Sequence, residues 1–385
     1  MPTTTIRAEH VGSLLRPEEL LTARAAHRRG ALSDKELTEL EDRAAAAAVK
    51  LQQDAGIQVF TDGEVRRDDF MASVVETVGG LTPAEESSAR PRWIRDSDGA
   101  ELEGDVASVA ITEPLYRRTP LSLAEARWLS GNAPGPYKIT MASPTMVAGF
   151  WRPGISDGVY PTRQDAVAAL ADIYPTRQDA VAALADIYRR DIADLIDAGV
   201  SWLQLDSLAY WANIDPEAAR MRRVTDLEGH LSHIIDTDNG LIRSARSRRP
   251  GMTVAMHFCR GNMRSAWSAR GGYEPIAERV FGEVEVDRFL LEYDTERSGG
   301  FEPLRFVPPA KTVVLGLVSS KVAELESVDT LRRRIDEASQ YLPLEQLALS
   351  PQCGFASTSQ GNLLTVDDQR RKLELVAETA RLVWG

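Results

Sequence analysis

Cysteine and histidine are scarce in this chain of 385 residues, which contains two cysteines and five histidines. Two cysteines cannot form the disulfide framework of a secreted scaffold of this length, so that class of protein is excluded. No apolar run approaches the roughly 18 residues that a membrane-spanning helix needs, so we expect no membrane partner. Residues 1–7 read MPTTTIR and lack the apolar core of a signal peptide. We therefore expect a cytoplasmic protein.

Basic residues are also in the minority, because 45 Lys and Arg stand against 57 Asp and Glu and give a net charge of −12. Nucleic-acid binding depends on clustered Lys and Arg, so this balance argues against nucleic acid as a partner. The composition, with 43% hydrophobic and 26% charged residues, is typical of a globular protein. This composition is compatible with a small-molecule ligand, and it does not decide whether the protein forms a homo-oligomer.

Short β-rich runs alternate with amphipathic stretches along most of the chain. The predicted strands are 6–13, 57–62, 137–141, 202–206, 252–259, 288–293, 312–318 and 346–350. The clearest predicted helices are 34–55, 187–198, 226–247 and 327–341. Eight strands that alternate with helices favour a (β/α)8 TIM barrel, an α/β fold, formed by residues 1–385 as a single catalytic domain. No G-x-G-x-x-G follows the first strand, which disfavours an open doubly wound sheet.

Two stretches interrupt this alternation. Residues 79–135 are rich in Pro, Glu, Ser and Gly, and we interpret them as an insertion after the second strand, with a hairpin around 93–111. Residues 160–173 and 174–187 both read YPTRQDAVAALADI, and this tandem duplication (160–187) is too exact to be ancient. It indicates a recent in-frame duplication or a sequence artefact.

The duplication has a predicted consequence for the helices. Pro175 lacks the N–H that a continuous helix needs, so it should begin a new helix at its first turn. We expect the second copy to continue into a barrel helix at 188–198, while the first copy forms an added helix outside the barrel.

Polar side chains gather where the predicted strands end, which is where (β/α)8 barrels place their chemistry. This set consists of Glu9, His10, Asp62, Glu64, Asp206, His257, Cys259, Glu292, Asp294, Ser319, Ser320 and Cys353. Both cysteines and one of the five histidines belong to it.

Four members of this set form a candidate metal site. His257 and Cys259 alternate on one strand, so their side chains point to the same side. Cys353 follows the last strand, and Glu292 ends an apolar run in which a carboxylate needs a cation or a partner. One nitrogen, two sulfurs and one oxygen suit a tetrahedral Zn2+. The alternative, that both cysteines are small buried hydrophobic residues, stays open on spacing alone.

Other candidates have simpler interpretations. His27 lies in a basic helical segment and is expected on a solvated face. His230 and His233 are three residues apart on a predicted helix, a spacing that can bind a metal, but nothing else in the sequence supports it. Asp206 either caps the helix that follows its strand or holds a substrate amine.

The order of several motifs resembles that of cobalamin-independent methionine synthases. The motifs are HVGSLLRP at 10–17, TDGE at 61–64, LQLD at 203–206, MHFCRGN at 256–262, LEYD at 291–294 and SPQCGF at 350–355. The chain is similar to the C-terminal catalytic barrel of these enzymes, and more closely to their short, single-barrel bacterial relatives. The similarity covers nearly the whole chain apart from 79–135 and the duplication.

The resemblance implies roles for individual residues. It implies that the zinc ligands are His257, Cys259, Glu292 and Cys353. It implies that Gly12 and Ser13, with His10 in the same motif, bind the amino-acid backbone of homocysteine. It also implies that the catalytic carboxylates Glu64 and Asp206 lie near the substrate amino group, and two acids suit an ammonium.

The same resemblance implies methyl transfer to homocysteine, which gives methionine. Zinc deprotonates the bound thiol, and the zinc-bound thiolate attacks the methyl group of the donor. Two departures leave the donor open between methyltetrahydrofolate and a methylcorrinoid. The chain has one predicted barrel where the synthase has two. It also reads GLVSSK at 316–321, where the synthase has a histidine thought to protonate the leaving group.

Three other functions stay open. A zinc-dependent epoxide:thiol transferase of the same family needs the same thiolate, but the implied amino-acid site favours homocysteine over a sulfonate thiol. A barrel like that of the uroporphyrinogen decarboxylases needs no metal, and His257, Cys259 and Cys353 argue against it. A non-catalytic zinc-binding module would lack an open coordination position and a deep pocket.

Overall fold

A six-stranded parallel sheet forms the centre of the computed structural model, which describes residues 5–84, 92–102, 109–147, 150–152, 154–160, 181–221 and 224–385. Its strands follow the order β10-β9-β8-β7-β6-β5. They are β5 (Ile139–Ala142), β6 (Trp202–Ser207), β7 (Thr253–Phe258), β8 (Arg288–Glu292), β9 (Thr312–Val318) and β10 (Leu347–Pro351). Nearly every strand residue is buried, as expected for a parallel sheet that is covered on both faces. The α/β class is therefore confirmed.

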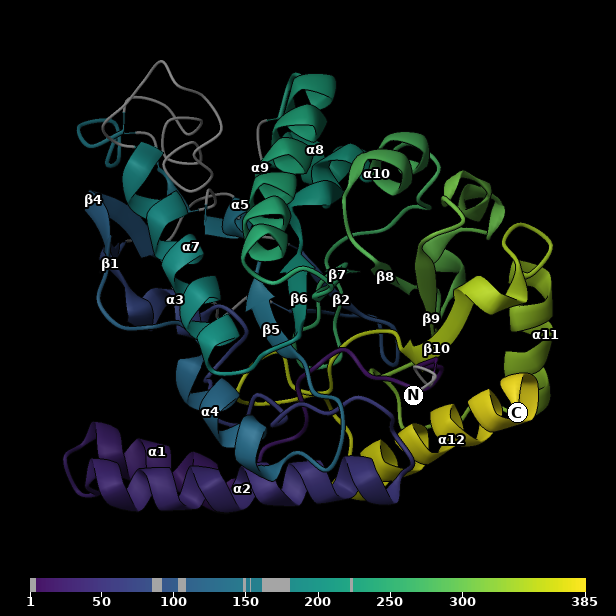
Figure 1. Cartoon of the computed structure of the whole chain (residues 1–385), viewed down its shortest axis with the longest axis horizontal. Coiled ribbons are helices and arrows are strands. Elements are labelled where there is room, and N and C mark those ends of the chain that lie inside the picture. The colour runs from purple at the N-terminus through teal and green to yellow at the C-terminus, as the bar shows by residue number, and fades with distance from the viewer. Residues whose placement is uncertain are drawn as a thin grey trace.

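Helices lie around the outside of this sheet (Figure 1). The longer helices are α1 (Glu18–Arg28), α2 (Asp34–Asp54), α7 (Val181–Asp197), α9 (Leu227–Arg248), α10 (Ala277–Glu283), α11 (Val328–Ala338) and α12 (Val366–Trp384). Shorter turns are α5 (Pro144–Val147), α8 (Pro216–Met221), η2 (Ala209–Asn213), η3 (Glu296–Ser298), η4 (Glu302–Phe306) and η5 (Leu344–Gln346). Capping boxes at Ser33 and Thr365 fix the starts of α2 and α12. Among the described residues, no helix has the length and apolar character of a membrane span.

The first predicted strand, 6–13, is an isolated bridge in the structure and not a regular strand. Ala8 pairs in parallel with Leu349 of β10, and the Gln58 N–H donates to the Ala8 carbonyl at 3.1 Å. The Gln58 side-chain oxygen accepts hydrogen bonds from the N–H groups of Arg7 and Ala8, at 2.7 and 3.0 Å. This side chain thus takes the place of ladder carbonyls, which is why no continuous strand forms.

The second predicted strand, 57–62, is likewise reduced to one bridge. Phe60 pairs in parallel with Tyr137, which lies two residues before β5. The Thr61 N–H donates to the side-chain oxygen of Gln52 on α2 at 2.9 Å instead of to a neighbouring strand. The two bridged segments nevertheless connect β10 at one edge of the sheet with β5 at the other.

The stretch 79–135 contains two antiparallel pairs. β1 (Val78–Pro83), which follows α3 (Ala72–Thr77), pairs with β4 (Val109–Arg117). β2 (Trp93–Arg95) pairs with β3 (Ala100–Leu102), and α4 (Leu123–Asn132) follows β4. The hairpin predicted around 93–111 is therefore too long, because β4 pairs with β1 and not with β2.

The β2–β3 hairpin docks on the segment that follows β7. Ile94 and Trp267 exchange backbone hydrogen bonds of 2.8 and 2.9 Å. The indole N–H of Trp267 donates to Asp96 at 2.7 Å, and Trp93 packs with Met263. The hairpin is thereby fixed beside the loop that contains Cys259.

The duplicated segment is described only in part. The described part of α7, Val181–Asp197, runs from the second copy through most of the predicted helix 188–198. Pro175 and nearly all of the first copy lie outside the described residues, so the added helix stays a prediction. Tyr160, the first residue of the duplication, is buried, and its hydroxyl accepts a hydrogen bond from Leu115 N at 3.0 Å.

A buried group of charges joins three distant parts of the chain. The Glu9 carboxylate lies 2.9 Å from Lys138 Nζ and 2.6 Å from Arg288 Nη2, and the Glu9 and Lys138 side chains are 0% exposed. Burial opposes ionisation of Glu9, but the attraction of Lys138 and Arg288 outweighs it and lowers its pKa to about 2. The group therefore holds the bridged segment at 6–13 against β8 and the residue before β5.

We predict that Glu9→Gln lowers the free energy of unfolding by about 3–5 kcal/mol, because two buried cations lose their counter-charge. Urea unfolding at neutral pH measures this loss. The difference from the unchanged protein should shrink as the pH falls from the ordinary Glu value of 4.5 towards 2, where native Glu9 becomes protonated. Lys35→Ala, which removes an exposed ion pair with Glu39, should leave the midpoint nearly unchanged. A pH-independent difference would contradict the assignment.

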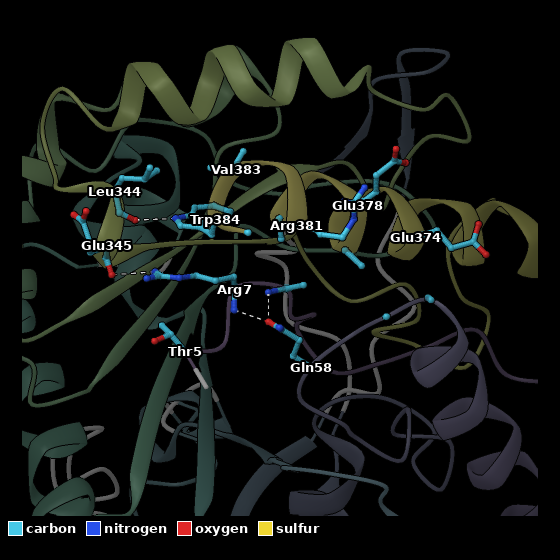
Figure 2. A pocket seen from close by; sticks show the side chains of 16 residues that line it. Thr5, Arg7, Gln58, Leu344, Glu345, Glu374, Glu378, Arg381, Val383 and Trp384 are labelled. Atoms are coloured by element: carbon cyan, nitrogen blue, oxygen red, sulfur yellow. Dashed lines mark hydrogen bonds between the residues drawn. The ribbon is translucent and has the colours of Figure 1, made fainter. Parts of the chain in front are cut away.

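A cavity of about 850 Å³ lies at the opposite end of the sheet from the candidate metal ligands, between the bridged N-terminal segment and α12 (Figure 2). Arg7 crosses it and donates to the Glu345 carbonyl at 3.0 Å, while its guanidinium lies 5.6 Å from the centre of the Trp384 ring. Trp384 in turn donates to the Leu344 carbonyl at 3.0 Å. These polar groups are already paired, and the amino ends of barrel strands contribute to stability and not to chemistry.

Candidate metal centre and substrate site

Four predicted ligands converge at the carboxyl ends of three strands. His257 lies on β7, Cys259 follows β7, Glu292 ends β8, and Cys353 follows β10. One ligand atom from each lies within 4.8 Å of the other three, and all four residues are buried. Among the residues that the structure describes, this is the one group of His, Cys, Asp and Glu with such geometry.

The geometry of this cluster fits a tetrahedral cation. The two sulfur atoms lie 3.6 Å apart and form no disulfide, and two ligands at the usual Zn–S distance of about 2.3 Å would lie about 3.8 Å apart. His257 Nε2 and Glu292 Oε2 are buried without any hydrogen-bond partner. His257 Nδ1 lies 3.3 Å from the Leu290 carbonyl, which leaves Nε2 as the ligand atom.

Ionisation of the two cysteines is unequal. Their mutual hydrogen bond, together with His257, lowers the pKa of Cys353 well below its ordinary value. The same hydrogen bond and burial raise the pKa of Cys259 well above it. One proton thus holds two buried sulfurs together, and a cation in its place would allow both to be thiolates.

Glu292 stays anionic although it is fully buried. Burial alone would raise its pKa, but Arg297, Lys321, Arg260 and His257 attract the carboxylate and lower the pKa below the ordinary value. Its Oε1 accepts a hydrogen bond of 2.5 Å from Arg260 N. The carboxylate is therefore charged and oriented by its surroundings.

Gly316 on β9 allows Cys353 to approach the other ligands. A Cβ at Gly316 would lie 2.7 Å from Gln352 Cα and 2.8 Å from the Leu291 carbonyl. The register between β10 and β9 shifts at Ser350/Pro351, immediately before Cys353. Gly316 was not predicted to matter for the site, although a glycine inside a strand is a signal of close backbone approach.

The predicted homocysteine loop lies against the Cys353 turn. The Ser13 carbonyl accepts from Phe355 N at 2.9 Å, and a Cβ at Gly354 would lie 2.0 Å from Ser13 Oγ. A Cβ at Gly12 would lie 2.3 Å from Glu64 Oε1. Gly12 and Ser13 therefore lie between Glu64 and the turn that contains Cys353.

The two predicted substrate carboxylates lie near the cluster. Asp206 is the register partner of His257 on the adjacent strand, and Gln204 Nε2 donates to it at 2.8 Å. Burial raises the pKa of Asp206 to about 7, the charge of His257 opposes this rise, and the charge of Glu64 adds to it. Glu64 accepts a hydrogen bond of 2.9 Å from Thr140 and has a left-handed backbone, with φ of 54°, of the kind that concentrates at functional sites.

The remaining histidines have other surroundings. His10 Nε2 lies 2.9 Å from Gln52 Oε1 on α2, so the role predicted for His10 in substrate binding gains no support from its contacts. His27 lies 2.7 Å from the exposed Asp34, and His230 lies 2.6 Å from Asn213. The described residues bring neither His230 nor His233 into a metal-binding group.

Two cations near the cluster were not singled out from the sequence. Lys321 is buried, and its Nζ lies 3.2 Å from the Gly261 carbonyl and 3.3 Å from Asn262 Oδ1. Arg297 lies 3.5 Å from Glu292 Oε2. Both follow strands that end at the site, which is the position that could have identified them.

Fold and site together define an α/β catalytic domain with a candidate thiolate-rich metal centre. Residues 173–366 match the sequence model of the family described as "Cobalamin-independent synthase, Catalytic domain". The "Uncharacterized protein YxjG" of Bacillus subtilis (strain 168) is 36% identical over 98% of this chain and 94% of its own length. The chain therefore belongs to the cobalamin-independent methionine synthase family, which confirms the resemblance seen in the motifs.

More distant relatives agree with this placement. The 5-methyltetrahydropteroyltriglutamate–homocysteine methyltransferase of Vibrio cholerae is 23% identical over 92% of this chain, which spans 40% of that enzyme. A solved structure from Listeria monocytogenes matches with a TM-score of 0.69 at 28% identity and covers 99% of this chain and 100% of its own. The B12-independent methionine synthase of Shewanella sp. W3-18-1 matches with a TM-score of 0.68 at 17% identity, covers 99% and 98% of the two chains, and shows the fold alone.

We predict that Gly316→Ala displaces the Cys353 turn, because the new methyl group meets backbone atoms of β8 and β10. Metal bound per chain, measured by elemental analysis, should fall well below that of the unchanged protein. Gly131→Ala is the matched control, since a Cβ there meets nothing within 4 Å. Equal metal content in both variants would show that the close approach at Gly316 does not matter for the site.

Proposed function

We propose that the protein is a zinc-dependent methyltransferase that converts homocysteine to methionine. The observation that carries this proposal is the buried group of His257, Cys259, Glu292 and Cys353, whose ligand atoms lie within 4.8 Å of one another. Two atoms of this group, His257 Nε2 and Glu292 Oε2, are buried without a hydrogen-bond partner, which supports a role of the group in binding a metal. We also propose that the two bridged segments complete an eight-stranded barrel formed by residues 1–385, with 79–135 as an insertion.

When bound, Zn2+ supplies a Lewis acid that lowers the pKa of a substrate thiol and keeps its sulfur nucleophilic. The residues of the chain bind and orient the substrate. Asp206 and Glu64 hold the substrate ammonium, while the backbone at Gly12 and Ser13 holds its carboxylate. Burial of the cluster excludes water, so the methyl group is transferred to sulfur and not to hydroxide.

The proposed reaction moves one methyl group. The thiol of homocysteine loses its proton, and a sulfur electron pair forms the new S–C bond with the methyl carbon. The bond between that carbon and the donor breaks, and its electron pair stays on the donor. For methyltetrahydrofolate the nitrogen that receives this pair takes up a proton, so one proton leaves the thiol and one is consumed. A methylcorrinoid would retain the pair on cobalt and release the proton.

A zinc-dependent epoxide:thiol transferase is the second candidate within the family. It would use the same cluster, but a sulfonate thiol has no amino group. Thr140 donates to Glu64, and Gln204, the register partner of Thr140, donates to Asp206. Two carboxylates held by neighbouring strand residues favour a substrate with an ammonium. Homocysteine is therefore favoured over a sulfonate thiol as the methyl acceptor.

We predict about one zinc per purified chain. Cys353→Ala should lose this metal, whereas His27→Ala, which changes an exposed histidine bound to Asp34, should retain it. Substitution with Co2+ gives a second measurement, since thiolate ligation produces charge-transfer absorption that Cys353→Ala should weaken. Active protein free of metal would remove this mechanism.

We predict that Asp206→Asn raises KM for homocysteine by about 10-fold or more, because a charged hydrogen bond to the ammonium is lost. Steady-state kinetics with homocysteine and with 4-mercaptobutyrate, which has no amino group, distinguishes loss of the ammonium contact from a general loss of thiol binding. KM for 4-mercaptobutyrate should stay the same. Asp236→Asn, at an exposed position of α9, is the matched control. Equal losses with both thiols would argue against an ammonium at Asp206.

A donor screen with methyltetrahydrofolate mono- and polyglutamates and with methylcobalamin identifies the methyl donor, which the proposed mechanism leaves open.

A further inference from the structure

A second cavity, of about 610 Å³, is connected to the candidate metal ligands through Arg297, which lines the cavity and lies 3.5 Å from Glu292 Oε2. It is lined by the segments that follow β6, β7 and β8, at the end of the sheet where the candidate ligands converge. The residues that matter for its chemistry are Asp215, Arg220, Trp267, Arg270, Glu296 and Arg297. The volume is in the range of small-molecule sites.

Arg297 is an unusual member of this lining. Its side chain is 7% exposed, yet its Nε and Nη1 are buried without a hydrogen-bond partner. Only Nη2 is engaged, at 3.3 Å from Asp294 Oδ1 and 3.5 Å from Glu292 Oε2. The guanidinium lies 5.2 Å from the centre of the Trp267 ring, which holds it in place. A buried guanidinium with two unpaired nitrogens is costly, and a turn of the Arg297 side chain towards the cavity that it lines would let a ligand complete its hydrogen bonds.

The charges around Arg297 favour an anion. Three cations, Arg297, Lys321 and Arg260, act on the Glu292 carboxylate, and the first two also act on Asp294. These cations balance the two carboxylates and the Cys353 thiol, whose pKa is also lowered, and a metal on Glu292 would add further positive charge. Elsewhere in the lining, the Asp215 carboxylate is occupied by the backbone N–H groups of Glu217 and Arg270. Glu217 and Glu296 are exposed.

We propose that this cavity binds a carboxylate or phosphate group of the methyl donor, with Arg297 as its anchor; the proposal rests on the methyl transfer proposed above. The acceptor is the less suitable occupant. Its carboxylate lies next to its amino group, and Glu64 and Asp206 already hold that amino group beside Gly12. The donor must instead reach the cluster from another side, and Arg297 lies directly beside Glu292.

The test measures direct binding of two donors in the absence of thiol, so it does not depend on turnover. The probes are 5-methyltetrahydropteroyltriglutamate, which carries carboxylates, and methylcobalamin, which carries a phosphodiester. Arg297→Met should raise Kd for at least one probe by about 10- to 100-fold, and Arg297→Lys should recover part of the loss. Arg332→Met, on the exposed face of α11, should bind as the unchanged protein does. The probe affected identifies the source of the anion.

Zinc content and KM for homocysteine, measured on the same variants, show how much of any change comes through Glu292, which Arg297 also attracts. Unchanged Kd values for both probes would overturn the proposal, as would binding of neither probe to the unchanged protein. Loss of zinc in Arg297→Met with normal donor binding would also overturn it, because Arg297 would then only position Glu292. Donor binding through Arg297 without any methyl transfer would instead leave the anion site standing and reject the proposed function.

Discussion

Placing two sulfurs, an imidazole and a carboxylate within 4.8 Å of one another is unfavourable in a buried space unless a positive charge joins them. The surrounding structure reduces this electrostatic penalty in several ways. One proton between Cys259 and Cys353 relieves the repulsion of the sulfurs, while the backbone N–H of Arg260 and nearby cations hold Glu292. The parallel sheet brings the four side chains together, because the carboxyl ends of its strands all lie at the same edge.

The sequence was informative where chemistry and periodicity coincide. His257 and Cys259 were predicted on one strand, and Glu292 near the end of another. The structure has His257 on β7, Cys259 directly after β7, and Glu292 at the end of β8. Each is visible locally, since an alternating H-x-C or a carboxylate at the end of an apolar run stands out in a short window. The parallel α/β sheet followed from the same local signals.

Features that depend on distant neighbours could not be read from the sequence. The segments 6–13 and 57–62 look like strands, but the side-chain oxygens of Gln58 and Gln52 replace their ladder partners. The importance of Gly316 depends on how closely β10 passes, and the unpaired nitrogens of Arg297 depend on the complete loop environment. Such contacts join residues that lie far apart in the sequence, so no short stretch of sequence indicates them.

The buried charges of Glu9, Lys138 and Arg288 have a consequence for how the chain acquires its structure during synthesis. Glu9 is separated from Arg288 by 279 positions, and Ala8 finds its bridge partner only at Leu349. Residues 8 and 9 are therefore synthesised long before the residues with which they pair. Until those residues are made, the Glu9 carboxylate has only part of its counter-charge, and the predicted homocysteine loop has no Cys353 turn to pack against. Contacts of such long sequence separation slow folding, so this protein should be exposed to aggregation and chaperone binding for longer than a helical protein of equal length.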